Sequence, residues 1–161
     1  MKLFITFILL FFSVFSYTQV INVDSIKYYL VELINEHRIT KGLGVLSYDN
    51  NLEISAQKHT DYMFVEGVLS HDELNKENPY YVGHNPWDRG CSDEICFKGV
   101  LQFTNNKNVA IKMFETWCKS KAHYSAIINK EHKFIGIGFN PTGPSKELGL
   151  FIMTSTITFN P

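Results

Sequence analysis

The sequence lacks an excess of charge of either sign. Its 15 lysine and arginine residues are balanced by 16 aspartate and glutamate residues. A nucleic-acid-binding domain presents a basic surface, so this balance argues against nucleic acid as the partner. With 45% hydrophobic and 19% charged residues, the chain also lacks the composition of a disordered tail. We therefore expect a folded domain.

Long apolar runs are missing except at the N-terminus. Residues 3–15 are almost entirely apolar and follow Lys2, but they are too few to cross a bilayer as a helix, which takes about 20 residues. A basic start, a short apolar core and small residues beyond it are typical of a secretory signal. We expect cleavage of residues 1–18 and one mature domain, 19–161, without a membrane span; an uncleaved anchor is the alternative. The expected location is secreted, periplasmic or cell-surface.

Cysteine is scarce, since only Cys91, Cys96 and Cys118 are present. Structural zinc sites need four ligands in paired motifs, and a single loose cysteine pair does not supply them. An exported protein meets oxidising conditions that permit disulfides. We expect Cys91 and Cys96 to form a disulfide across a short turn. Cys118, in a predicted helix, is then left over, either buried or paired between molecules.

Hydrophobic periodicity divides the chain into helices followed by strands. Apolar residues at helical spacing predict a helix capped by Asp24 or Ser25, a second after Asp49 and a third after the asparagines at 105–108. We further expect a strand at 95–103, a short helical turn at 122–128, and strands at 134–139 and 150–159. This order predicts an α+β fold with helices packed on an antiparallel sheet.

Histidines and a long loop are the candidates for function. Residues 70–90 are polar and rich in turn residues, and long loops in compact domains are commonly functional. His59 lies on the apolar face of the second predicted helix, so we expect a core histidine bonded to backbone. His132 lies among polar residues and is expected at the surface.

Two sets of residues resemble the CAP superfamily, which comprises cysteine-rich secretory proteins, antigen 5 and pathogenesis-related proteins, and specifically its bacterial branch. The resemblance runs in order from about Ile26 to Phe159. In the first half it consists of residues 34–38, Gly42-Leu43, Leu46, Leu52, Ala56, His59, Met63 and Ser70-His71. In the second half it consists of Trp117, Ser120, His123, residues 127–129 and Ile135-Gly136-Ile137-Gly138.

The resemblance implies a three-layer α-β-α sandwich with a small antiparallel sheet and a cleft lined by two histidines and two acids. His71 matches the first histidine and His123 the second. The family's Gly-Glu-Asn-Ile element, which holds the first acid, is absent, and Glu94 is the nearest match. Ser120 stands where the second acid usually lies. The expected cleft therefore consists of His71, Glu94, Ser120 and His123.

Two classes of function fit this cleft. Two imidazoles can bind a divalent cation such as zinc, so His71 and His123 are the candidate metal ligands. The same histidines, with Glu94 as the acid, are the candidate catalytic residues of a secreted, protease-like hydrolase. Because one acid is replaced, we expect a non-enzymatic binding module for a cation, lipid or peptide. We expect the protein to be a monomer. No cofactor is required beyond a weakly bound divalent cation such as zinc.

The expected signal predicts that mature protein begins near Gln19. N-terminal sequencing of protein recovered from the cell envelope or the medium measures this directly. Intact Met1 on most molecules would contradict the prediction.

Overall fold

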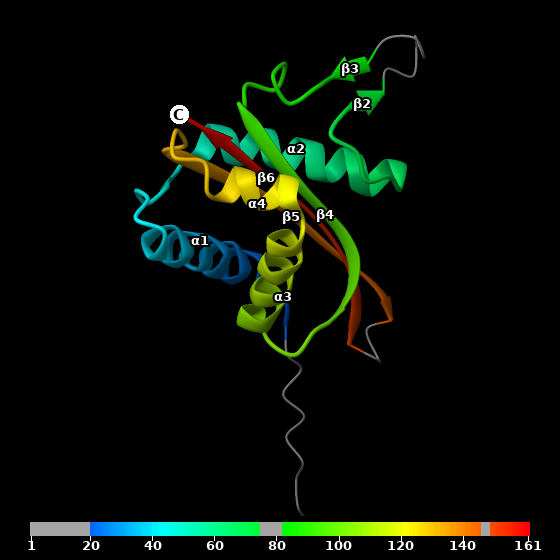
Figure 1. Ribbon diagram of the computed structural model, residues 1–161. Coiled ribbons are helices and arrows are strands. Elements are labelled where there is room, and N and C mark those ends of the chain that lie inside the picture. Colours follow the sequence, from blue (N-terminus) through cyan, green and yellow to red (C-terminus); the bar gives the residue numbers. More distant parts are fainter. Residues whose placement is uncertain (1–19, 75–81, 146–148) are drawn as a thin grey trace, which may run out of the picture.

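The computed structural model describes residues 20–74, 82–145 and 149–161, so the expected signal at 1–18 lies outside the described residues. The helices are α1 (Val23–Thr40), α2 (Asn50–Glu66), α3 (Asn106–Lys119) and α4 (Lys121–Ile127). The strands are β1 (Ser47–Tyr48), β2 (Glu73–Leu74), β3 (Val82–His84), β4 (Asp93–Gln102), β5 (Phe134–Ser145) and β6 (Leu150–Asn160) (Figure 1).

The helices begin where a side chain can accept a hydrogen bond from the first turn. The side chain of Asn22 accepts from Ser25 N at 2.8 Å, so α1 starts slightly before the expected cap at 24–25. Asp49 caps α2 and Asn105 caps α3, as predicted. Gly67 ends α2 with φ of 70°, a left-handed conformation that glycine adopts without strain.

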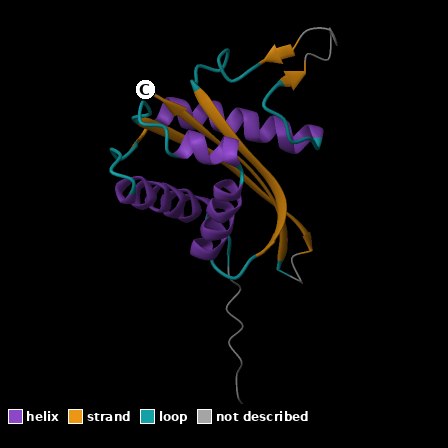
Figure 2. Ribbon diagram, in the orientation of Figure 1, coloured by secondary structure: helices purple, strands orange, loops and turns teal. Residues whose placement is uncertain are grey.

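The main sheet has the order β1-β5-β6-β4, and its three long strands are antiparallel. The short strand β1 pairs with β5 in parallel, so the sheet is mixed rather than wholly antiparallel as expected. Helix α2 covers one face, whereas α1, α3 and α4 lie on the other (Figures 1 and 2). The predicted three-layer α-β-α sandwich is thus confirmed, with a separate pair of short strands, β2 and β3, in the segment after α2.

Strand register decides which side chains meet α2. Successive residues of a strand point to opposite faces, so every second position belongs to one layer. Isoleucines at 95, 137 and 157 enter the core with α1 and α3. The rows facing α2 are instead Glu94–Thr158–Gly136 and Cys96–Thr156–Gly138.

Small residues in these rows let α2 lie close to the sheet. The hydroxyl of Thr158 donates to the Leu52 carbonyl of α2 at 3.2 Å. A Cβ atom added at Gly138 would lie 2.3 Å from the Ala56 carbonyl oxygen, and Gly136 is equally close to α2. Glycine is therefore required here by the close approach of two backbones.

A buried arginine joins α1 to the end of α4. The Arg38 guanidinium is fully buried and donates to the backbone carbonyls of Gly44, Ile127, Asn129 and His132. The prediction that His132 is exposed was wrong. Its ring stacks on Phe159 with centroids 5.0 Å apart, and Nδ1 lies 3.1 Å from the Ala126 carbonyl, which satisfies a polar atom in the interior.

The close approach of α2 to the sheet predicts that a larger residue at position 138 destabilises the fold. Replacing Gly138 by alanine should lower the free energy of unfolding by about 3 kcal/mol, because the new methyl group overlaps the α2 backbone. Gly44→Ala is the matched control, since no atom lies within 4 Å of the added carbon and its effect should stay within about 0.5 kcal/mol. Urea denaturation measures both, and equal losses would show that α2 does not pack as described.

Candidate functional site

The candidate site lies at the β4 edge of the main sheet, where the two helical layers can meet. Strand β4 is the outermost strand, with α4 near one face and α2 behind the other. His71 follows α2, Glu94 lies on β4 and His123 lies on α4. All three line one cavity of about 300 Å³. A neighbouring cavity of about 230 Å³ shares His71 and His123 and adds Cys96, and we call the two cavities together the cleft.

Ser120, the fourth expected residue, does not line either cavity. Its side chain caps α4 instead, accepting a hydrogen bond from His123 N at 3.4 Å. Because α4 follows α3 directly, its first N–H groups need an acceptor, and a serine at the junction supplies one. The structure thus brings together three of the four residues, and Ser120 acts through the helix that carries His123.

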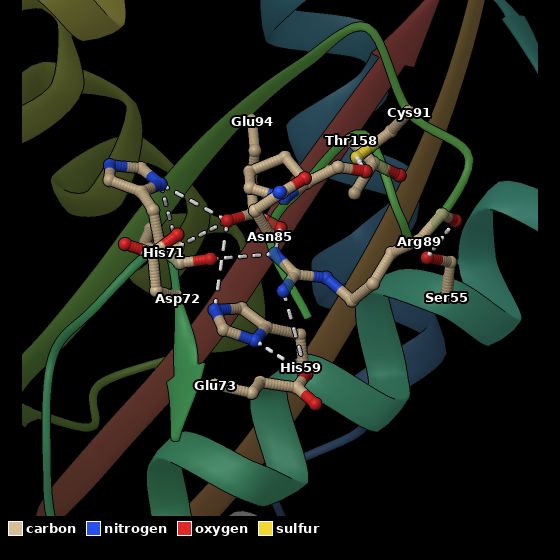
Figure 3. A network of polar contacts seen from close by, with 12 residues as sticks. Ser55, His59, His71, Asp72, Glu73, Asn85, Arg89, Cys91, Glu94 and Thr158 are labelled. Atoms are coloured by element: carbon tan, nitrogen blue, oxygen red, sulfur yellow. Dashed lines mark hydrogen bonds and ion pairs between the residues drawn. The ribbon is translucent and has the colours of Figure 1, made fainter. Parts of the chain in front are cut away.

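The Glu94 carboxylate is the centre of a buried ionic network (Figure 3). Its Oε1 lies 3.0 Å from His71 Nδ1, and its Oε2 accepts from Arg89 Nη2 at 2.6 Å. Arg89 also donates to the His71 carbonyl at 3.0 Å and lies 3.6 Å from Glu73. Both carboxylate oxygens of Glu94 are therefore engaged, and the His71 ring is oriented by one of them.

A tight turn positions Arg89. Asn85 N donates to Asp88 Oδ2 at 3.2 Å, and Asp88 N donates back to Asn85 Oδ1 at 3.0 Å. The Ser55 hydroxyl of α2 donates to the Arg89 carbonyl at 2.9 Å, which fastens the turn to the helix. Nothing in the polar 70–90 segment distinguishes Arg89 as a buried residue, so its role was missed at the level of sequence.

His59 completes the network from α2. Its Nδ1 lies 2.9 Å from Glu73 Oε1 and its Nε2 lies 2.7 Å from the Ser70 carbonyl, so each nitrogen faces an acceptor. Both ring nitrogens of His59 are therefore occupied within the network. The backbone bond that we expected is present, but the contact with Glu94, whose Oε1 lies 3.6 Å from Nε2, was missed.

These contacts shift the pKa values of the two cleft histidines in opposite directions. Burial alone would raise the pKa of Glu94, but the hydrogen bond from His71 and the charges of His59 and Arg89 outweigh it, and the pKa is lowered. The hydrogen bond to Glu94 raises the pKa of His71. Burial, and then the charge of His71, lower the pKa of His123. Over a range of pH, His71 is therefore charged while His123 is neutral.

The cysteines require a correction, because all three thiols are free and the expected Cys91–Cys96 disulfide is not formed. The Cys91 thiol donates to the Pro86 carbonyl at 3.1 Å. Strand β4 is extended at about 3.3 Å per residue, which carries Cys96 about 10 Å beyond Asp93 and opposes the close Cα approach that a disulfide needs. Burial raises the pKa of Cys91 to about 12 and raises that of Cys96 further, so neither free thiol is a ready nucleophile.

The network yields a stability prediction. Replacing Arg89 by methionine should lower the free energy of unfolding by about 3–5 kcal/mol, because it leaves the buried Glu94 carboxylate without its closest cation. Lys112→Met is the control, since its exposed ion pair with Glu115 should contribute less than about 0.5 kcal/mol. Urea denaturation at neutral pH measures both, and a loss for Arg89→Met no larger than for the control would mean that the network does not stabilise the fold.

Comparison with solved structures finds the same fold in exported bacterial proteins. An outer surface protein from Borrelia burgdorferi is 18% identical with a TM-score of 0.64, covering 87% of this chain and 96% of that one. An extracellular protein containing an SCP domain from Bacillus anthracis is 17% identical with a TM-score of 0.54, covering 88% of this chain and 45% of that one. At these identities the likeness shows the fold alone.

The family is shown by sequence. No curated protein matches the chain. The family model described as the cysteine-rich secretory protein family, CAP, matches residues 31–155, which include every residue of the cleft. A match over more than half of the chain places this protein in the CAP family, as the motifs from residue 26 onward indicated.

Proposed function

We propose that this CAP protein acts outside the cytoplasm as a non-enzymatic binding module, and that its cleft holds a divalent cation at His71 and His123. The observation that carries the proposal is the orientation of His71. Glu94 engages Nδ1, and the other ring nitrogen points away from the ionic network (Figure 3). That nitrogen is left for the cleft, which His123 also lines.

The charges around the cleft suit a cation-binding histidine. A metal-binding histidine typically donates its second ring nitrogen to a carboxylate, which fixes the tautomer and raises ligand basicity. Glu94 stands in this relation to His71. Burial already favours the neutral, ligating form of His123. Two imidazoles with water completing the shell make a weak, pH-dependent site, and the fold requires no bound cofactor.

The geometry gives less support to hydrolysis, the alternative function for this cleft. Besides an imidazole base, hydrolysis needs an acid or a nucleophile that is free to act on the substrate. Both oxygens of Glu94 are engaged, and Ser120 is a helix cap. The buried thiols are held in the protonated form. We therefore infer binding rather than catalysis.

Two observations support an extracellular location. The Borrelia relative is named an outer surface protein, and the Bacillus relative is described as extracellular. Within the residues that the structure describes, no helix is long and apolar enough to cross a membrane. Together with the N-terminal apolar run, the descriptions of these two relatives favour export.

The cation site yields a pH prediction. Zinc competes with the proton on His71, and the pKa of that ring is raised, so affinity should fall as the pH drops through a value above about 6.5. We expect zinc affinity at pH 5.5 to be at least about tenfold below that at pH 7.5, measured by isothermal titration calorimetry.

Alanine variants test whether His71 and His123 bind the zinc ion. His71→Ala and His123→Ala should each remove zinc binding at pH 7.5. His37→Ala is the control, because His37 contacts Tyr124 at 3.0 Å and does not line the cleft. Equal zinc binding by all four proteins would place the cation elsewhere and overturn the proposal.

A further inference from the structure

We propose that Cys96 adds a thiolate to the cleft, so that His71, Glu94 and Cys96 form a three-ligand site for a thiophilic divalent cation such as Zn²⁺. The inference deepens the proposed function, on which it rests for the cation-binding role of His71. It differs in the ligand set, because two histidines alone would not prefer soft metals, whereas a thiolate does. It also differs in the ring nitrogen used, since the ion replaces the proton between His71 Nδ1 and Glu94.

The three ligand atoms already form the face of a small coordination polyhedron. His71 Nδ1 lies 3.0 Å from Glu94 Oε1, Cys96 Sγ lies 3.4 Å from the same oxygen, and Cys96 Sγ lies 3.7 Å from His71 Nδ1. Tetrahedral zinc, with bonds of about 2.0–2.3 Å, separates such ligand atoms by about 3.3–3.6 Å. Shifts of a few tenths of an ångström would therefore accommodate the ion.

The fold holds these ligands in place before any ion arrives. Glu94 and Cys96 are two residues apart on β4 and point to the same face. The Trp117 indole donates to the Cys96 carbonyl at 3.1 Å, which fixes this part of the strand. Cys96 nevertheless lines the smaller cavity together with His71 and His123, so the fourth coordination position opens onto the cleft for water or His123.

His59 is excluded as the third ligand, although its ring also lies within 4.8 Å of the Glu94 and Cys96 ligand atoms. Both of its nitrogens are engaged, by Ser70 and by Glu73. Its role is electrostatic. Arg89 and His59 contact the carboxylates Glu73 and Glu94, and the thiolate that forms at Cys96 when the metal binds adds a further anionic ligand. A coordinated metal removes the thiol proton, which leaves to solvent.

Cobalt(II) tests the ligand set, because it replaces zinc and gives a thiolate-to-cobalt charge-transfer absorption in the near ultraviolet. Wild-type protein should show this absorption at one equivalent of cobalt. Cys96→Ser should lose it and bind zinc at least about tenfold more weakly. Cys118→Ser is the matched control, since that cysteine lies on α3 away from the cleft and its variant should behave as wild type. No charge-transfer absorption in wild type, or its retention in Cys96→Ser, would overturn the inference.

A second measurement uses unaltered protein, since a variant of a buried residue can unfold. X-ray absorption at the zinc K-edge of wild-type protein with one equivalent of zinc should show a sulfur neighbour at about 2.3 Å from the metal. A zinc ion surrounded by nitrogen and oxygen neighbours alone would contradict the inference.

The two proposals fail separately. Zinc binding that His123→Ala abolishes, without a thiolate signal, would leave the two-histidine cleft standing and remove Cys96 from it. A thiolate signal that survives His123→Ala would keep the three-ligand site and remove His123 from the ligand set.

Discussion

The candidate site depends on a single buried carboxylate, that of Glu94. A buried charge is strongly unfavourable unless cations and hydrogen bonds compensate it. Its partners are Arg89 from a turn, His71 from the segment after α2, and His59 from α2 itself. The same compensation therefore fixes three parts of the chain against β4. It also orients the His71 ring so that its other nitrogen points away from the network (Figure 3).

The packing of α2 on the sheet brings His59 within reach of Glu94. Glycine at 136 and 138, with threonine beside them, leaves little side-chain volume between β5 and α2. The helix consequently lies near the strand backbones, and His59, one turn beyond Ala56, comes within reach of Glu94. Larger residues in these rows would move α2 outward and separate the His59 ring from the Glu94 carboxylate. The close packing of α2 and the contact of His59 with Glu94 therefore depend on the same small residues.

Much of the fold could be predicted because its causes are local. Asp49 and Asn105 cap helices as their chemistry requires, and strand alternation marks 95–103 and the two terminal strands. The convergence of His71 and His123 could be expected only through family motifs. The role of Arg89 and the contact of His59 with Glu94 could not be predicted, because their partners lie on other elements and are brought near only by tertiary packing.

The errors have equally physical causes. The disulfide between Cys91 and Cys96 was inferred from compartment and sequence spacing, neither of which accounts for an extended strand between them. His132 was judged by polar neighbours, although stacking on Phe159 and the backbone decide its burial. In both cases the strands of the main sheet decide the surroundings of the residue, and its neighbours in the sequence do not.

The central claim is that Glu94 prepares His71 to hold a cation in the cleft. Diffraction from a zinc-soaked crystal, collected at the zinc absorption edge, tests it most directly. The account predicts one anomalous peak at bonding distance from His71 and from at least one of Cys96 and His123, with Glu94 still paired to Arg89. A fully occupied zinc ion bound elsewhere, with the His71 ring unliganded, would contradict it.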